Sequence, residues 1–247
     1  MQASLQKIRK ICVKNISKTF QTAQGTLEAL KNVSFEVEEG TCTVIGGENG
    51  SGKSLLMSIL SGLEEADAGT VETFSKIGLV FQEAETQILG ETPAEDVAFG
   101  PKNLKWPEEK VKTAVKKALE KTGLSAKANF PARFLSGGEK RRLAVACMLA
   151  MDLPVFILDE PYANLDYTGV KQVNSLITEL KKDGKTVIIL SHEIEKCLGL
   201  ADRFIVLFRG KKVFDGMPEA ALRENLEQWN IRNPLNSYKS VKDLLWL

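Results

Sequence analysis

The feature that most constrains this chain is a glycine-rich loop between an apolar segment and a helical one. Residues 47–54 satisfy the pattern G-x-x-x-x-G-K-[ST], Thr43–Ile45 before them predicts a strand, and Lys53–Leu60 predicts a helix. Glycines let successive backbone N–H groups point inward at phosphate oxygens, and the helix adds the positive end of its dipole. The predicted phosphate-binding residues are Gly47, Glu48, Asn49, Gly50, Ser51, Gly52, Lys53, Ser54 and Leu55.

The end of this loop supplies a cation and a hydroxyl beside the phosphate site. Lys53 is expected to bridge the β- and γ-phosphates of a nucleotide, and Ser54 to complete the shell of a magnesium ion shared with that nucleotide. A chance glycine-rich turn is the alternative. The strand before the loop and the helix after it favour the functional interpretation.

Two adjacent carboxylates follow a second apolar segment. Val155–Leu158 predicts a buried strand that ends at Asp159 and Glu160. A strand orients only one of two neighbouring side chains directly toward a metal, and Asp159 is the better magnesium ligand. Glu160, one residue further along the turn, is placed to polarise an attacking water as a general base. An ordinary strand end at the surface is the alternative, and the phosphate loop disfavours it.

The composition excludes several other classes of protein. The 33 lysines and arginines nearly balance the 32 aspartates and glutamates, so the net charge of +1 gives no global field for nucleic acid or anionic lipid. Cys12, Cys42, Cys147 and Cys197 form no C-x-x-C pair, which argues against a structural zinc site and a secreted disulfide framework. No apolar stretch reaches membrane-spanning length, so any spans are expected in another subunit.

Short β-branched and aromatic segments recur along the chain and predict an α/β fold. Several are apolar without alternation, which suits strands buried on both faces of a mostly parallel sheet. The predicted strands are Ile11–Val13, Val33–Val37, Thr43–Ile45, Ile77–Phe81, Val155–Leu158, Val187–Leu190 and Phe204–Phe208. The predicted helices are Lys53–Leu60, Glu108–Lys121, Glu139–Ala150 and Val170–Leu180.

The order of these elements predicts one domain with an insertion. We expect a P-loop NTPase core over residues 1–82 and 151–217, with a mostly parallel sheet and a small antiparallel β region from the N-terminal strands. The stretch 83–150 is mostly helical and is expected to form an inserted helical subdomain. Residues 218–247 are expected to form a helical extension, whose apolar end Leu244–Leu247 packs on the core or contacts a partner.

The most specific motif is Leu135-Ser136-Gly137-Gly138-Glu139, which resembles the signature of ATP-binding-cassette ATPases. It directly precedes a predicted helix, so Ser136 and the amides of Gly137 and Gly138 are placed at a helix N-terminus, a second anion-binding position. A mere helix cap is the alternative. The resemblance implies that two cassettes face each other head to tail, so that each ATP contacts one subunit's phosphate loop and the other's signature.

Further positions resemble family motifs in the expected order. The resemblance assigns Phe20 to stacking on adenine and Gln82 to sensing magnesium and water beside a transmembrane partner. Asp166, in Ala163-Asn164-Leu165-Asp166, resembles the acid of the loop that carries one subunit's state to the other. His192, the only histidine in the chain, resembles the switch histidine that contacts the γ-phosphate. Without the resemblance, Phe20 would be assigned to the core and an isolated histidine would have no special meaning.

Four positions depart from the family pattern. Leu55 stands where threonine is usual, which removes a hydroxyl near the α-phosphate, and Gly46 replaces a usual aliphatic residue. Tyr162 and Asn164 are uncommon in their loop. None of these changes removes a catalytic group, so they bear on nucleotide affinity and rate, where one neutral hydrogen bond is worth about 1 kcal/mol.

A narrower resemblance lies after the glutamine. Gln87-Ile88 and Thr92–Pro101 resemble the corresponding segment of energy-coupling-factor ATPases, which drive uptake of vitamins or of nickel and cobalt, and Asp202-Arg203 and Phe214–Gly216 fit that group. The resemblance implies a second ATPase subunit (a copy or a paralogue), a transmembrane coupling subunit and a substrate-binding membrane subunit. It also implies a peripheral position on the cytoplasmic face of the membrane. We expect the docking surface near Gln82–Pro101.

Two other functions share these nucleotide motifs. Cassette ATPases that act on DNA carry a long coiled-coil insertion between phosphate loop and signature, whereas the stretch from Lys53 to Ser136 is short and has no sustained heptads. A cassette that works with a soluble scaffold in cluster assembly would be distinguished by its partner. A binding module without hydrolysis is disfavoured because Glu160 and His192 are both present.

Overall fold

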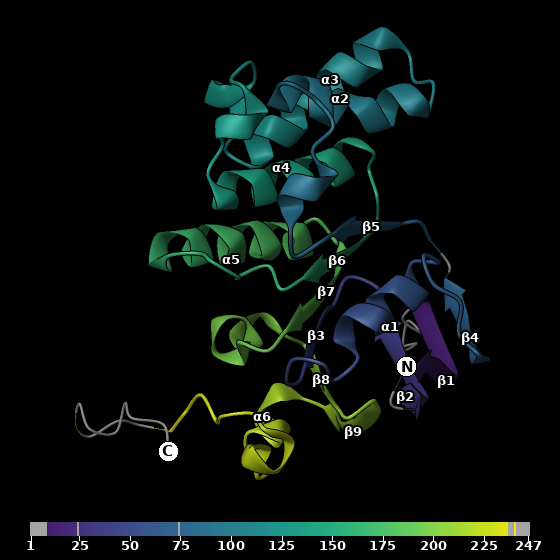
Figure 1. Ribbon diagram of the computed structural model, residues 1–247. Helices are drawn as coiled ribbons and strands as arrows, with labels where there is room; N and C mark the ends of the chain where they lie inside the picture. The colour runs from purple at the N-terminus through teal and green to yellow at the C-terminus, as the bar shows by residue number, and fades with distance from the viewer. Residues whose placement is uncertain (1–8, 24, 74, 237–239, 241–247) are drawn as a thin grey trace, which may run out of the picture.

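The computed structural model describes residues 9–23, 25–73, 75–236 and 240, which form two sheets, with helices on both sides of the larger one (Figure 1). The larger sheet has the strand order β5-β6-β7-β3-β8-β9, in which only β9 pairs antiparallel to its neighbour. Its strands are β3 (Cys42–Gly46), β5 (Ile77–Val80), β6 (Val155–Asp159), β7 (Thr186–Ser191), β8 (Arg203–Phe208) and β9 (Lys211–Gly216). The predicted α/β fold with a mostly parallel sheet is confirmed.

The smaller sheet is antiparallel and has the order β2-β1-β4. Strands β1 (Arg9–Thr22) and β2 (Gly25–Glu38) form a long hairpin that contains two of the predicted strands, and β4 (Ala68–Thr73) pairs with β1. The sequence does not predict β4 or β9, because their side chains are exposed or only half-buried and give no apolar pattern. The predicted small antiparallel region is nevertheless present.

Four of the described α-helices follow the segments predicted for them closely, and the other two lie in stretches predicted only to be helical in general. The α-helices are α1 (Lys53–Leu60), α2 (Pro93–Asn103), α3 (Glu108–Lys121), α4 (Gly137–Ala150), α5 (Tyr167–Lys182) and α6 (Pro218–Ala221). Single 3-10 turns are η1 (Ala84–Gln87), η2 (Ser125–Lys127), η3 (Ala132–Phe134), η4 (Ile194–Lys196), η5 (Leu198–Leu200) and η6 (Leu226–Trp229). The apolar end predicted at Leu244–Leu247 lies outside the described residues. Within the described residues, no helix has the length and apolarity to cross a membrane.

The central sheet is buried on both faces because its strands carry apolar side chains in both directions. One face, which includes Ile157 and Ile188, packs against α1 and the β1–β2 hairpin. The opposite face, which includes Phe156 and Ile189, packs against α4 and α5. The helix after the phosphate loop and the helix after the signature motif therefore lie on opposite sides of the same sheet.

A third apolar cluster joins α2, α3 and α4 into the helical part of the molecule, at the top of Figure 1. Helix α4 belongs to both regions: Ala144 and Val145 pack toward the sheet, while Leu143 and Ala146 pack toward α2 and α3. Since α4 begins at the signature motif, this helix fixes the position of that motif relative to the sheet and to α2 and α3.

Candidate nucleotide-binding site

The loop between β3 and α1 adopts a backbone conformation that requires glycine. Gly47, Gly50 and Gly52 all have positive φ angles, and a Cβ atom on Gly47 would lie 2.2 Å from the carbonyl oxygen of Leu207. The loop therefore packs directly on the neighbouring strand β8 and opens at the N-terminus of α1, where unpaired amides favour an anion. Asn49 and Gly50 are exposed, while Ser51 is buried.

Lys53 points back across this loop. Its Nζ donates to the carbonyl oxygens of Gly47 (2.8 Å) and Glu48 (3.1 Å) and lies 3.6 Å from Oε1 of Glu160. Burial lowers the pKa of Lys53, and the negative charge of Glu160 opposes this effect. The ammonium is thus a desolvated cation held at the loop by carbonyls and one carboxylate, the form in which a lysine binds phosphate strongly.

Asp159 ends strand β6 with a buried oxygen that has no partner. Its Oδ1 makes no hydrogen bond within the described part of the chain, although the residue is only 5% exposed. Burial raises the pKa of Asp159, whereas a hydrogen bond with the Ser54 hydroxyl lowers it. An orphan carboxylate oxygen beside a hydroxyl fits the protein side of a magnesium site. No group of three or more His, Cys, Asp or Glu side chains suited to a metal exists among the described residues, so further ligands would come from phosphate and water.

Glu160 lies in the turn after β6 with a φ of +44°, the left-handed region that non-glycine residues rarely adopt. Its carboxylate accepts a hydrogen bond from the Ser191 hydroxyl (3.1 Å) and another from the backbone N–H of His192 (3.1 Å). The His192 imidazole also reaches it, with Nδ1 2.9 Å from Oε1. Because His192 is exposed and Glu160 is buried, the pair connects the interior of the site to its open side.

The structure thus brings four predicted residues together: Lys53, Asp159, Glu160 and His192. Gln82 follows the end of β5, the strand next to β6, and its side chain is exposed. Phe20 lies on the hairpin opposite Leu27 and is 38% exposed, so it is available at the surface and not in the core.

The signature motif forms a separate site at the start of α4. The Ser136 side chain accepts from the Glu139 N–H, and the Glu139 carboxylate accepts from the Ser136 N–H, which completes a capping box. Ser136 and Gly137 are exposed and Gly138 is half-buried. Asp166 likewise caps α5, because its Oδ1 accepts from Gly169 N at 2.7 Å. The signature is not joined to the phosphate loop within the chain, since α4 and α1 occupy opposite faces of the sheet.

Three of the four departures have a local structural reason. A Cβ atom on Gly46 would lie 2.8 Å from the Phe204 ring, which fills the space of a side chain there. Tyr162 is fully buried and donates its hydroxyl to Asn174 at 2.7 Å. Asn164 has a φ of +58°, which asparagine adopts more readily than most residues.

Leu55, the fourth departure, is half-buried against the apolar cluster of α1.

Two contacts of the site could not be read from the motifs alone. Ser191, to which the motifs assign no role, ends strand β7 directly before His192 and donates its hydroxyl to the Glu160 carboxylate. Asn230, in the C-terminal extension, donates to the Glu48 carboxylate at 2.6 Å across 182 residues of sequence. The position of Ser191 next to the predicted switch histidine was a signal for its contact with Glu160. No local sequence pattern marks the contact of Asn230 with Glu48.

Known proteins share this arrangement. A family model described as "ABC transporter" matches residues 30–163 of the chain. The energy-coupling factor transporter ATP-binding protein EcfA2 of Thermotoga maritima is 41% identical over 84% of this chain and 82% of its own length. The chain belongs to the ATP-binding-cassette transporter family. The resemblance inferred from the signature motif is therefore confirmed.

Further similar proteins are also described as transporter ATP-binding proteins, as parts of ABC transporters or as ATP-binding cassettes. A protein of Methanospirillum hungatei with the same name, EcfA2, is 39% identical over 84% of this chain, which spans 56% of that relative's length. The structure of cbiO1 from Clostridium perfringens, described as part of the ABC transporter complex cbiONQ, superposes with a TM-score of 0.79 at 32% identity, covering 92% of this chain and 96% of that one. A dimeric post-hydrolysis structure of the cassette MJ0796, bound to ADP and Pi, superposes with a TM-score of 0.76 at 28% identity. The superposition covers 84% of this chain and 98% of that one. The P-loop NTPase fold is thereby confirmed.

Proposed function

We propose that this chain is the ATP-hydrolysing subunit of an energy-coupling-factor importer for a vitamin or a transition-metal ion. The observation that carries the proposal is the placement of two anion-binding sites on opposite faces of one sheet, a phosphate loop with its carboxylates and a capped signature. One chain holds each half of a nucleotide site, so two chains arranged head to tail complete two sites. Relatives with energy-coupling-factor names, and dimeric cassette structures, support this proposal. Phosphate release from ATP by the purified chain, with and without Mg²⁺, tests the hydrolysis that this proposal requires.

Each residue of the site has a proposed role. The loop from Gly47 to Leu55, which includes Lys53, holds the phosphates. Glu160 accepts a proton from the attacking water. His192 orients Glu160 through the contact at Nδ1 and offers its other ring nitrogen toward the γ-phosphate. Magnesium, when bound by Ser54, Asp159 and Gln82, would neutralise phosphate charge during transfer.

The partner chain would supply Ser136, Gly137 and Gly138 at the helix N-terminus of its α4, together with its Asp166. Phe20 is proposed to stack on the adenine. The helical part, residues 83–150, is proposed as a subdomain that carries the signature, attached to a core of residues 1–82 and 151–217 with an extension from residue 218. A position on the cytoplasmic face of the membrane follows from the proposed membrane partners.

Asp159→Asn separates the metal role from folding. Burial raises the pKa of Asp159 above its unfolded value, so this group favours folding only at low pH, and its ionised form costs stability as the pH rises through the folded pKa. Removing the charge is therefore expected to raise the Tm of nucleotide-free protein at pH 7.5 by roughly 2–4 °C, the shift typical of about 1 kcal/mol. Magnesium-dependent ATP binding should be lost in the same variant.

Differential scanning fluorimetry at pH 7.5, with ATP titrated in the presence and absence of Mg²⁺, measures both effects of Asp159→Asn. A Tm below that of the parent would contradict the account of Asp159 as a destabilising buried charge. Magnesium-stimulated binding equal to the parent's would contradict its role as a metal ligand.

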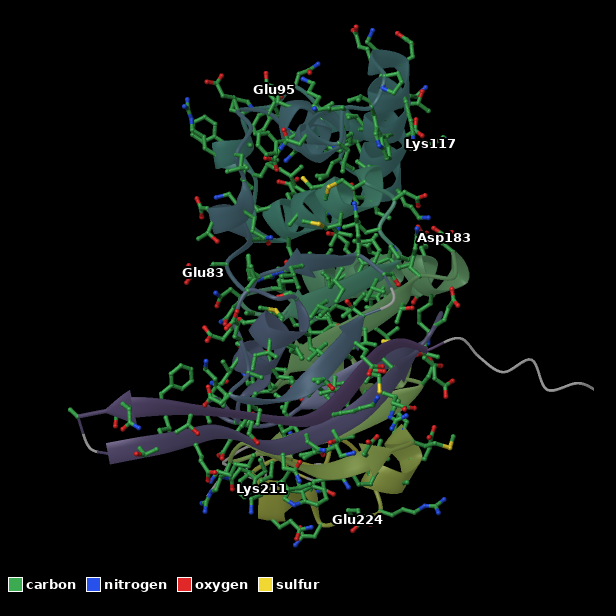
Figure 2. All side chains as sticks on the ribbon, turned by 90° about the vertical axis from the view of Figure 1, so that its right-hand side faces the viewer. Glu83, Glu95, Lys117, Asp183, Lys211 and Glu224 are labelled. Carbon is green, nitrogen blue, oxygen red and sulfur yellow. The ribbon has the colours of Figure 1, made fainter. Side chains whose placement is uncertain are left out.

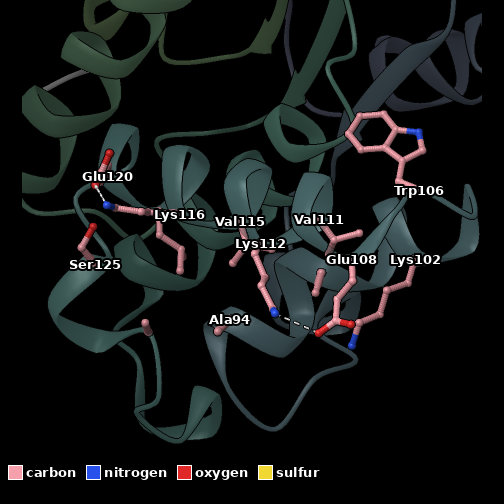
Figure 3. A pocket seen from close by; sticks show the side chains of 13 residues that line it. Ala94, Lys102, Trp106, Glu108, Val111, Lys112, Val115, Lys116, Glu120 and Ser125 are labelled. Carbon is pink, nitrogen blue, oxygen red and sulfur yellow. Dashed lines mark ion pairs between the residues drawn. The ribbon is translucent and has the colours of Figure 1, made fainter.

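The proposed docking surface for the transmembrane subunit begins at Gln82 and continues through α2. A hollow of about 650 Å³ lies between α2 and α3 and is lined by apolar side chains such as Ala94, Val111 and Val115 (Figure 3). Lysine and glutamate side chains surround it, among them the ion pair of Lys112 with Glu108 (2.9 Å). A short apolar helix of a membrane subunit fits this lining better than a charged segment does.

Cysteine cross-linking tests this docking surface. Single cysteines at Leu89, which is 67% exposed, or at exposed Glu95 should capture the membrane subunit when the transporter is co-expressed and treated with a bifunctional maleimide. Glu224→Cys is the matched control, because Glu224 is exposed at the opposite end of the molecule from Glu95 (Figure 2). Mass spectrometry identifies the captured polypeptide.

The native cysteines need not be removed for this experiment. Cys12, Cys42 and Cys197 are buried, Cys147 is half-buried, and burial raises the pKa of each thiol, that of Cys42 to about 12. Thiols of this kind react slowly at neutral pH because little thiolate is present. Labelled cysteines at Leu89 and Glu95 that capture no membrane subunit, or that capture no more than Glu224→Cys, would count against this surface.

A further inference from the structure

Helix α4 carries a buried cation that the nucleotide site does not use. Arg141, in the first turn after the signature, is only 7% exposed. Its Nη2 donates to the carbonyl oxygen of Gln82 at 3.0 Å, and its Nη1 donates to the carbonyl oxygen of Ala163 at 3.1 Å. The guanidinium therefore joins three segments that are far apart in sequence: the signature helix, the end of β5 and the turn after β6.

The surroundings of Arg141 show that stability alone does not explain its charge. No carboxylate of the described residues lies within ion-pair distance of Arg141, and its buried Nε has no hydrogen-bond partner there. A buried cation without a counterion costs folding free energy, and an apolar side chain of similar volume avoids that cost. What the guanidinium supplies is geometry, because its planar fork donates from two separate nitrogens in a fixed arrangement, which the single nitrogen of a lysine does not reproduce.

Both carbonyls belong to segments next to catalytic groups. Ala163 ends the turn that begins at the candidate base Glu160, because the Ala163 N–H donates to the Glu160 carbonyl oxygen at 3.1 Å. Gln82 begins the docking segment, and Phe81 beside it is fixed by the Gln87 side chain at 2.8 Å. A displacement of either segment is thus transmitted through Arg141 to the first turn of α4, where the signature lies.

We infer that Arg141 is a positioning residue that holds the Gln82 segment and the Glu160–Ala163 turn at a fixed distance from the signature helix. This inference rests on the proposed function and deepens it. A docking event at Gln82 and the arrangement of the base are coupled through two hydrogen bonds of one side chain. Arg141 contacts the backbone of Gln82, a proposed magnesium ligand, but it contacts neither the phosphate loop nor Glu160 itself, so phosphate binding by a single chain does not depend on it.

The neighbouring Arg142 provides a matched control. It follows Arg141 in the second turn of α4 and donates to the carbonyl oxygen of Thr122 at the end of α3 and to the Gln172 side chain on α5, away from Gln82 and Ala163. Arg141→Met and Arg142→Met remove the same fork from the same helix. They differ in which segments are released and in burial, since Arg141 is buried and Arg142 is half-buried.

ATPase kinetics give the first readout. For Arg141→Met we expect kcat to fall about 10- to 100-fold through misplacement of the base, with KM and nucleotide stoichiometry close to the parent's. Arg141→Lys, which can still donate to one carbonyl, should be intermediate. Arg142→Met should retain kcat within a few-fold. If Arg141→Met does not fold, Arg141→Gln, which keeps one amide donor, replaces it.

Hydrogen exchange gives a readout that general destabilisation would not produce. The amides of Ala163, Leu165 and Thr86 are bonded within the two released segments, so their exchange should accelerate in Arg141→Met while that of α4 and α1 stays parental. Acceleration throughout α4, or a kcat equal to that of Arg142→Met, overturns the inference. A parent protein without magnesium-dependent ATPase activity overturns the proposed function instead, which keeps the two failures distinct.

Discussion

Glu160→Gln is expected to lower the ATPase rate by about 10²- to 10⁴-fold, the usual loss when a general base is removed, while ATP binding is retained. Glutamine keeps the size of the side chain and one acceptor oxygen for the Ser191 hydroxyl or the His192 N–H, but it is a very poor proton acceptor. The phosphate loop is unchanged. Lys53 loses a carboxylate at 3.6 Å, which leaves its ammonium free to bind phosphate.

The expected consequence of Glu160→Gln is a nucleotide-bound dimer that does not turn over. Sedimentation with ATP and Mg²⁺ measures the dimer, and phosphate release measures the rate. Glu193→Gln is the matched control, because Glu193 follows His192 in the same loop but its carboxylate pairs with Lys196. The assignment of Glu160 is falsified if Glu160→Gln hydrolyses ATP at the parent rate.

The central strands could be predicted because their burial leaves little choice of residue. Val155–Leu158 and Val187–Leu190 are apolar at every position, and the structure buries each of them on both faces between α1 and α5. The phosphate loop could be predicted for a similar reason: the positive φ angles at Gly47 and Gly52 are available to few residues other than glycine. In both cases the local requirement is strict enough to mark the sequence.

The missed features depend on contacts between distant segments. Strand β4 is exposed at nearly every position, so only its pairing with β1 makes it a strand. The left-handed backbone of Glu160 is imposed by its surroundings, where its N–H donates to the Leu190 carbonyl oxygen at 2.8 Å. Arg141 is one of three consecutive basic residues in the sequence, and its burial depends on the end of β5 and the turn after β6.

The head-to-tail dimer predicts that two inactive variants restore activity when they are combined. Lys53→Ala removes the cation of the phosphate loop, and Ser136→Arg places a long cationic side chain at the exposed N-terminus of α4. In a dimer of identical chains either change damages both sites. A mixed dimer places both changes in one composite site and leaves the other with native Lys53 and native Ser136.

Mixed dimers, isolated with two affinity tags from cells that express both variants, should regain about half of the parent ATPase activity if one intact site can work alone. The decisive control places both substitutions in one chain and pairs it with the parent. That dimer contains the same two changes, but each composite site now carries one of them, so activity should fall to background. Dimers of the parent with Ser136→Arg, which keep one intact site, establish whether a single site suffices. If they are active while the Lys53→Ala and Ser136→Arg mixture is not, each nucleotide site lies within one chain and the head-to-tail arrangement is wrong.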